Sequence, residues 1–292
     1  MSQPNSWSNP SKVGASEAVQ MAAFLEQRSN TADMVGVNHK LNEVMAGKPG
    51  ERLLEVGSGS GVLCRMVAAS IRPSGFITGL DISPEMSTEA YRYARSMGTP
   101  SGIVFHVGSA ECLPYPEGNF DGAFAARILL HVSNPDQVLG EMARVVKPGG
   151  RIVVMDWDYE TVTVDHPDRE LSRRILNWRT DHHGEENWSG RTLWRRMCTT
   201  GLHDISVHPY TAVANHESDS LTQSLFRAAK SACDEGVISS IQQDAWMLEL
   251  QERIRSGVFF ASITYFIVKG IVGMPRISFP EKALHTMNPT EV

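Results

Sequence analysis

The feature that most constrains this chain is a glycine-rich segment, GSGSG at residues 57–61, placed between a short apolar run and a stretch of helical spacing. The run at 52–56 predicts a strand and the stretch at 62–71 predicts a helix, so the glycines mark a tight strand-to-helix turn. Such a turn lets the backbone approach a ligand closely and directs the unpaired N–H groups of the helix toward it. A ligand site is therefore expected at this turn.

The spacing of these glycines narrows the choice of ligand. The dinucleotide-binding pattern GxGxxG would place its third glycine at position 62, where this chain has Val62. Glu55 precedes the turn at the end of the strand, where its charge would repel a pyrophosphate but suit the ammonium group of an amino acid moiety, directly or through water. The turn thus favours a nucleoside ligand that has no pyrophosphate.

A second acidic residue, Asp81, ends the next predicted strand. A carboxylate in this position typically accepts hydrogen bonds from ribose hydroxyls. The alternative is that Asp81 caps the helix that starts at Pro84. The ribose role fits the nucleoside ligand that the glycine turn indicates.

The alternation of strands and helices continues along the chain. Strands are predicted at 76–82, 103–107, 120–125 and 151–157, and helices at 84–97 and 135–146. This order is typical of a parallel sheet covered by helices. Later helices are expected at 219–233 and 239–255, and later strands at 204–210 and 259–268, the final strand antiparallel beside the 204–210 strand.

The chain divides into an N-terminal helical segment at 1–48, a possible lid, and a larger domain at 49–292. Helical patterning over 16–46 ends at the KPG sequence of 48–50. After residue 157 the rhythm changes, and a polar segment rich in His, Arg and Trp follows. We interpret residues 158–202 as an insertion that builds the substrate pocket.

Composition excludes several classes of protein. The formal net charge of −6, without a dense Lys/Arg run, gives no general attraction to nucleic acid. Four scattered cysteines form no CxxC pair, and no metal-binding motif is present, so no metal is expected. The N-terminus lacks the apolar core of a secretory signal, and the apolar stretch at 258–272 is interrupted and shorter than the about 20 residues of a membrane span. We expect a cytoplasmic protein without a membrane span.

Several spaced motifs name a family. They are LLEVGSGSG at 53–61, GLDISPEM at 79–86, GSAECLPY at 108–115, NFD at 119–121 and VVKPGG at 145–150. In this order they resemble the class I S-adenosylmethionine-dependent methyltransferases, in the branch of ubiquinone/menaquinone-biosynthesis and natural-product enzymes. The resemblance is firm over residues 52–156 and loose elsewhere. It implies an α/β fold with a Rossmann-like, doubly wound, seven-stranded sheet whose last strand is antiparallel, and S-adenosylmethionine as cofactor, with S-adenosylhomocysteine as product.

The resemblance also implies which residues surround the cofactor. The loop after the third strand would hold the adenine, although Ser109 stands where the family usually has Asp, which weakens or replaces the usual carboxylate contact. The end of the fourth strand would pass beside the methionine moiety. Arg28 suits bidentate binding of the methionine carboxylate, with a solvated surface residue as the alternative. The predicted cofactor-binding residues are Arg28, Glu55, Gly57, Ser58, Gly59, Gly61, Asp81, Ile82, Met86, Ser109, Ala110, Glu111, Ala126 and Arg127.

The sequence constrains the residues around the methyl acceptor less than those around the cofactor. Methyl transfer from a sulfonium needs alignment and exclusion of water, and a base only for some acceptors, such as a phenol or an activated carbon acid. His131 follows the fourth strand and is the first candidate base, with a structural role as the alternative; His166, His182 and His183 of the insertion are further candidates. Aromatic residues of the same region, Trp157, Tyr159, Trp178 and Trp188, would wall an apolar acceptor, and Asp156 and Asp158 would line the pocket.

Three functions remain open from the sequence. The first is methyl transfer to O, N or C of a small-molecule metabolite, such as a quinone-like or natural-product intermediate, by a monomer or homodimer. The second is a protein of the same fold that binds S-adenosylmethionine but catalyses a cyclisation or rearrangement without methyl transfer. The third, a nicotinamide-dependent oxidoreductase, is disfavoured by Val62 and Glu55.

Overall fold

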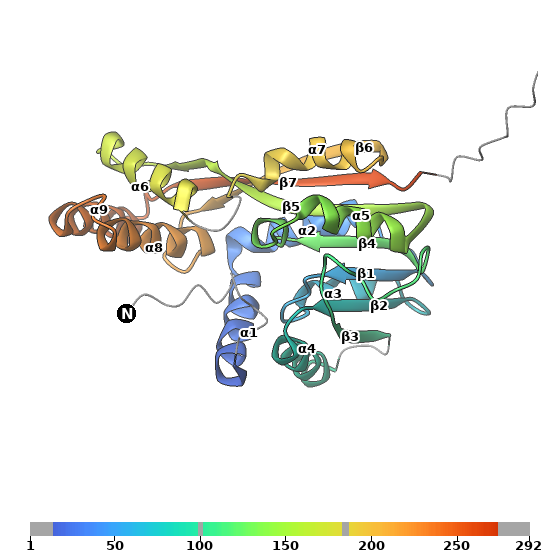
Figure 1. Cartoon of the computed structure of the whole chain (residues 1–292). Helices are drawn as coiled ribbons and strands as arrows, with labels where there is room; N and C mark the ends of the chain where they lie inside the picture. The colour runs from blue at the N-terminus through green and yellow to red at the C-terminus, as the bar shows by residue number, and fades with distance from the viewer. Residues whose placement is uncertain (1–13, 99–101, 183–186, 274–292) are drawn as a thin grey trace, which may run out of the picture.

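A single mixed sheet organises the chain (Figure 1). The computed structural model describes residues 14–98, 102–182 and 187–273. The seven strands lie in the order β3-β2-β1-β4-β5-β7-β6, and β7 is antiparallel to both of its neighbours. The predicted fold class is confirmed. The strands are β1 (Arg52–Val56), β2 (Phe76–Asp81), β3 (Ile103–Val107), β4 (Phe120–Ala126), β5 (Val146–Val164), β6 (His203–Ala214) and β7 (Ala261–Ile271).

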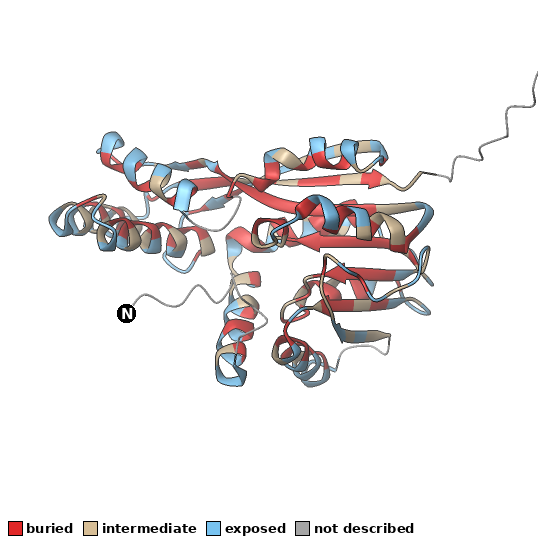
Figure 2. Cartoon of the chain, in the orientation of Figure 1, coloured by how far each residue is buried: buried red, intermediate tan, exposed pale blue. Residues whose placement is uncertain are grey.

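Helices cover both faces of this sheet. They are α1 (Ala15–Ser29), α2 (Ala32–Met45), α3 (Val62–Ser70), α4 (Pro84–Ser96), α5 (Pro135–Val145), α6 (Arg169–His182), α7 (Ser189–Thr199), α8 (Ser220–Asp234) and α9 (Ser240–Arg255), with a short 3-10 helix, η3, at Leu129–His131. One apolar cluster joins one face of the sheet to α2, α3 and α8, and a second cluster joins the opposite face to α5 and α7. Figure 2 shows the buried residues concentrated along the central strands.

The strand β5 is much longer than the 151–157 strand that the sequence predicts. It pairs with β4 as far as Met155 and then continues with β7 as far as Val164. The first residues of the predicted insertion therefore extend the sheet, because the alternating TVTV sequence at 161–164 suits a strand. This extension, with α6, α8 and α9, forms a lobe that projects past the ends of β1 and β4 (Figure 1).

The two N-terminal helices are anchored differently. The helix α2 contributes Met34, Val37 and Leu41 to the main apolar cluster and packs along β5, β6 and β7. The helix α1 is held to α3 by an ion pair between Glu26 and Arg65, with 2.6 Å between Oε2 and Nη2. The division into a segment at 1–48 and a domain at 49–292 stays a prediction. In the part of the chain that the structure describes, no helix is long and apolar enough to cross a membrane.

Candidate active site

The glycine turn lies at the carboxyl end of β1, as the sequence predicts. Gly57, Gly59 and Gly61 all have positive φ angles, of 74°, 51° and 73°. The N–H groups of Gly57 and Ser58 donate to the carbonyl of Leu80 in β2, at 2.8 and 2.9 Å. These bonds tie the turn to the end of β2, where the second acidic residue stands.

Asp81 organises this end of β2. Its carboxylate accepts hydrogen bonds from the N–H groups of Gly59 and Ser83, at 2.9 and 3.0 Å. Burial raises the pKa of the carboxyl above its ordinary value, although these backbone donors counteract the shift. The N-cap of α4 is Ser83, whose Oγ accepts from the N–H of Met86 at 3.1 Å, so the helix-cap alternative for Asp81 is wrong. Each Asp81 oxygen still has a lone pair for a ribose hydroxyl.

Glu55 lies beneath the turn and is only 2% exposed. Burial raises the pKa of this carboxyl to about 8, against hydrogen bonds from the thiol and N–H of Cys64 and the charges of Arg127 and Arg65. Its Oε2 is buried and has no hydrogen-bond partner among the described residues, and the same holds for Ser58 Oγ. A buried acceptor left open in this way fits an ammonium group, so the residues of the turn fit the amino acid end of S-adenosylmethionine.

The proton on Glu55 leads to a testable prediction. With a pKa of about 8 the carboxyl is mostly protonated at neutral pH, and a bound ammonium favours the carboxylate. Binding of S-adenosylmethionine should therefore release a proton between pH 6 and 7.5, and affinity should rise with pH over that range. Calorimetry in buffers of different ionisation enthalpy measures this release, which should vanish in Glu55→Gln. Equal proton release in the variant and the wild type would assign the proton to another group.

The loop after β3 is fixed by contacts to α5. The N–H of Glu111 donates to Ser109 Oγ at 3.2 Å, and the Glu111 carboxylate accepts from the N–H of Asn134 at 3.0 Å. Gln137 Nε2 donates to the carbonyl of Glu111 at 2.7 Å. This carboxylate therefore anchors the loop, which leaves Ser109 and the backbone of Ala110 for an adenine.

Ile82 and Met86, the other residues predicted to flank the nucleoside, differ in their exposure. Ile82 is 41% exposed and so is open to a ligand. Met86 is 2% exposed and packs against Ala18, Met21 and Ala22 of α1. A role for the Met86 side chain would require α1 to shift.

Two arginines mark the end of β4 where the methionine moiety is predicted. Arg127 has a φ of 61°, a left-handed conformation that is uncommon for a residue with a side chain. Its Nη1 donates to Asn38 Oδ1 at 3.3 Å, and burial together with the charge of Arg28 lowers its pKa to about 10. The guanidinium of Arg28 lies over the ring of Trp157, 5.2 Å from its centroid, and its buried Nε has no hydrogen-bond partner among the described residues. Arg28 is thus part of the interior and not a solvated surface residue.

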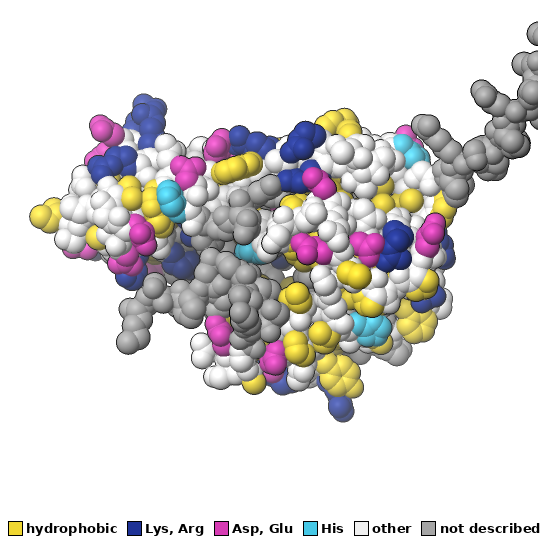
Figure 3. Space-filling model, viewed as in Figure 1, with side chains coloured by type: hydrophobic (Ala, Val, Ile, Leu, Met, Phe, Trp, Pro, Cys, Tyr) yellow, Lys and Arg dark blue, Asp and Glu magenta, His cyan; other side chains and the backbone are white. Residues whose placement is uncertain are grey.

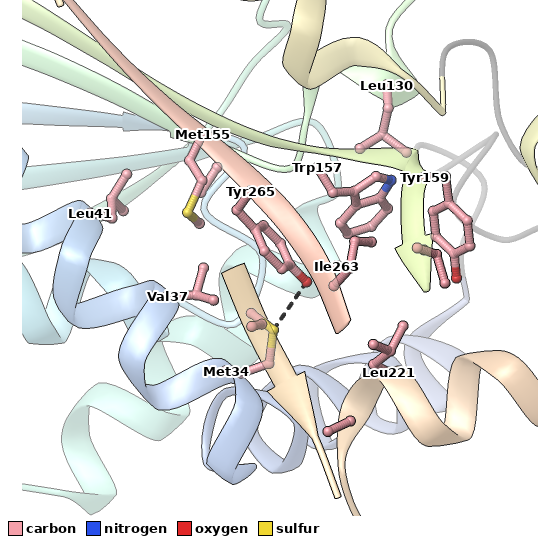
Figure 4. Packing of buried hydrophobic residues seen from close by; sticks show 14 of the residues in the cluster. Met34, Val37, Leu41, Leu130, Met155, Trp157, Tyr159, Leu221, Ile263 and Tyr265 are labelled. Carbon is pink, nitrogen blue, oxygen red and sulfur yellow. Dashed lines mark hydrogen bonds between the residues drawn. The ribbon is translucent and has the colours of Figure 1, made fainter. Parts of the chain in front are cut away.

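His131 belongs to the same group. It ends η3, directly after β4, and burial followed by the charge of Arg28 lowers the pKa of its imidazole to about 4. Three aromatic residues lie nearby in the extended sheet: the Trp157 ring is 6.3 Å from Tyr159 and 6.1 Å from Tyr265 between centroids, both edge to face. Figure 4 shows these rings in one buried cluster with Leu130 and Leu221. Arg28 acts on the pKa of both His131 and Tyr265.

Two of the other candidate histidines, His166 and His182, do not lie in this group. His166 stacks on Trp246 of α9, with 5.5 Å between centroids, and its Nδ1 accepts from the N–H of Asp168. His182 is exposed and stacks on Trp178 at 5.3 Å. Both histidines therefore make structural contacts and do not lie beside the cofactor residues. His183 lies outside the described residues.

Asp156 and Asp158 are also placed differently from the prediction. Both are fully buried and face α7, where Ser189 Oγ donates to Asp156 at 2.9 Å and Arg191 forms a salt bridge with Asp158. The prediction that they line the pocket is wrong, because on β5 they point to the face opposite Trp157.

The structure adds residues to the site that the sequence reasoning missed. Arg179 of α6 lies over the ring of Tyr159, with 5.2 Å between its Cζ and the centroid, and Ser224 and Arg227 of α8 lie beside it. One signal was present in the sequence. Arg179 follows Leu171 and Ile175 at four-residue spacing, which puts an arginine on the apolar face of α6.

Comparison with known proteins identifies relatives of this chain. The family described as a methyltransferase domain matches residues 54–154. A 37.1 kDa protein of transposon TN4556 from Streptomyces fradiae, described as uncharacterized, is 30% identical over 258 residues, which cover 88% of this chain and 73% of that protein. Demethylmenaquinone methyltransferase of Symbiobacterium thermophilum is 33% identical over 109 residues, which cover 37% of this chain and 43% of that enzyme. The match to that enzyme thus spans less than half its length.

Solved structures share the fold at low sequence identity. Phosphoethanolamine N-methyltransferase 2 of Haemonchus contortus, in complex with S-adenosyl-L-methionine, has a TM-score of 0.57 and 13% identity, covering 89% of this chain and 58% of that one. The [4+2]-cyclase SpnF has a TM-score of 0.53 and 20% identity, covering 82% of this chain and 80% of that one.

The sheet order and the glycine turn together define a Rossmann-like fold of the methyltransferase type. The chain belongs to the class I S-adenosylmethionine-dependent methyltransferases, and S-adenosylmethionine is its cofactor. The family predicted from the sequence motifs is confirmed.

Proposed function

We propose that this enzyme transfers a methyl group to an O, N or C atom of a small-molecule metabolite of quinone-like or natural-product type. The observation that carries the proposal is the buried aromatic group of Trp157, Tyr159 and Tyr265, which adjoins Arg28 and His131 at the end of β4. Aromatic side chains of this kind suit a small apolar acceptor. The surface supports the same choice, since on the face in Figure 3 acidic and basic side chains are interspersed without a continuous basic stretch.

The residues of the site have separate roles in this proposal. S-adenosylmethionine, when bound, supplies a methyl group on a positively charged sulfur. Asp81 holds the ribose, while Glu55 and Arg28 hold the ammonium and carboxylate of the methionine moiety. These contacts fix the direction of the methyl group, and the aromatic group excludes water and aligns the acceptor, which are the main requirements of an in-line displacement.

His131 acts in this scheme as a hydrogen-bond acceptor. Proton transfer from a phenol of pKa near 10 to an imidazole of pKa about 4 is uphill by roughly 8 kcal/mol, so His131 is a poor base for a separate deprotonation. Its neutral ring suits a hydrogen bond that orients an acceptor hydroxyl or amine while the methyl group arrives.

Replacing His131 by Ala should lower kcat/KM about 100-fold, a typical loss for a group that positions a reacting proton. The shape of the pH profile between pH 6 and 8 should not change, because His131 is already neutral throughout that range. The measurement is the rate of product formation against pH for wild type and variant. A change in the wild-type rate near pH 6.5 that is absent from the variant would contradict the role of His131 as a neutral hydrogen-bond acceptor.

The test of the function itself is formation of S-adenosylhomocysteine. Purified protein is incubated with S-adenosylmethionine and panels of phenols, amines and activated carbon acids, and the methylated product is identified by mass spectrometry. Turnover with one panel supports the proposal and identifies the methylated atom. Tight cofactor binding without S-adenosylhomocysteine, but with conversion of a polyunsaturated substrate, would favour the cyclisation function, to which the weak basicity of His131 is equally suited. A cytoplasmic location and a homodimer stay predictions.

A further inference from the structure

Four arginines lie along the site, from its cofactor end to its acceptor end. They are Arg28, Arg127, Arg179 and Arg227, and among the described residues none of them forms a salt bridge. They form one electrostatic group: Arg28 acts on the pKa of Arg127, and Arg179 and Arg28 act on that of Arg227. A partly buried group of like charges is costly unless an anion completes it.

Arg179 is the most enclosed member of this group. The residue is 7% exposed, its Nη2 donates to Ser224 Oγ at 3.4 Å, and its buried Nε has no hydrogen-bond partner among the described residues. The guanidinium therefore has unused donors beside the hydroxyls of Tyr159 and Ser224, which hydrogen bond to each other. A fork of guanidinium donors flanked by hydroxyls is the chemistry that recognises an oxyanion.

The elements packed around Arg179 supply further positive charge. Burial opposes ionisation of Tyr159, but Arg179, the hydrogen bond to Ser224 and Arg227 outweigh it and lower the pKa of the phenol. The charged groups that act on Arg227 are Arg179, Tyr159 and Arg28, from α6, β5 and α1. Glu55 and Asp156 act instead on Arg127, at the cofactor end. The part of the group formed by Arg179 and Arg227 is thus uncompensated.

We propose that the acceptor carries an anionic oxygen group, a carboxylate or a phosphate, which Arg179 and Arg227 bind with the hydroxyl of Ser224. This inference rests on the proposed function and names the class of its substrate. Arg28 binds the methionine carboxylate of the cofactor, so Arg179 and Arg227 are left for the acceptor. The arginines therefore bind one molecule of cofactor and one molecule of acceptor. With the anion at Arg179, the body of the acceptor lies against Tyr159 and Trp157 and its reacting atom points toward His131.

The test separates the acceptor anion from the cofactor. S-adenosylhomocysteine is bound first, so that the methionine carboxylate is in place, and the complex is titrated by calorimetry with benzoate, with its neutral isostere benzamide and with inorganic phosphate. We expect benzoate to bind roughly 10-fold or more tightly than benzamide, the difference expected for a charge-assisted hydrogen bond. Arg179→Gln and Arg227→Gln should remove this preference while leaving S-adenosylhomocysteine binding within about 2-fold of wild type.

The matched control is Arg169→Gln, an exposed arginine at the first residue of α6, which should leave both ligands unaffected. Arg227 lies at the exposed edge of the group, so its variant folds even if loss of the buried Arg179 disturbs α6. Equal binding of benzoate and benzamide without binding of phosphate, or a benzoate preference that persists in Arg227→Gln and Arg179→Gln, overturns the inference while the proposed function stands. Failure of S-adenosylhomocysteine to bind the wild type overturns both. A preference for phosphate over benzoate supports the inference and assigns the anion as a phosphate.

Discussion

Replacing Asp81 by Ala should weaken binding of S-adenosylmethionine about 100-fold. The carboxylate has a free lone pair on each oxygen for the two ribose hydroxyls, and loss of two charge-assisted hydrogen bonds of about 1.5 kcal/mol each corresponds to that factor. The same carboxylate also holds the N–H groups of Gly59 and Ser83, so the variant loosens the glycine turn as well. Calorimetric titration with S-adenosylmethionine and S-adenosylhomocysteine measures the total loss of affinity, from the ribose hydrogen bonds and from the loosened turn.

Two further variants separate the contributions to this loss. Asp81→Asn keeps one acceptor oxygen and should fall between wild type and Ala. Asp121→Ala removes an acid at the start of β4, where it accepts from the N–H of Arg52 and pairs with Lys147. That end of the sheet is opposite the glycine turn, so the control should lose stability without losing affinity. An Asp81→Ala protein that binds S-adenosylmethionine as tightly as wild type would remove Asp81 from the cofactor site.

The cofactor half of the site was predictable because its determinants are local. The positive φ angles at residues 57, 59 and 61, and the strand ends that carry Glu55 and Asp81, follow from neighbouring residues in the chain. Even there, the sequence could not show that Glu111 binds α5 with its carboxylate. That contact joins two elements whose meeting depends on the whole fold.

The acceptor half was predicted less well because it depends on tertiary pairing. The length of β5 is set by β7, more than 90 residues later in the chain, and only this pairing brings Trp157 and Tyr265 together. The aromatic character of the insertion was visible in the sequence, but the partners of each ring were not. His166 and His182 illustrate the same limit, since each stacks on a tryptophan that could equally have been pocket or core. The position of Arg179 was a signal of the acceptor site that the sequence reasoning missed, because it puts an arginine on the apolar face of a helix.

Replacing Gly61 by Ala should lower the free energy of unfolding by about 3 kcal/mol. The residue has a φ of 73°, a conformation that costs a residue with a side chain about 1–2 kcal/mol. An added Cβ would also lie 2.5 Å from Cζ of Phe105, a ring that is also close to Gly79. The crowding adds about 1–3 kcal/mol. For a chain of this size the melting temperature should fall by roughly 6–10 °C, which thermal unfolding followed by circular dichroism measures.

The control for Gly61 is another glycine with neither constraint. Gly140 lies on the exposed face of α5, with nothing within 4 Å of an added Cβ, so Gly140→Ala should stabilise the protein by about 0.5–1 kcal/mol. Opposite signs for the same chemical change would attribute the cost at position 61 to the turn and to Phe105. A Gly61→Ala protein that melts at the wild-type temperature would show that the turn relaxes and the ring moves without cost. The tight path of this turn over β2 would then not be needed for the fold.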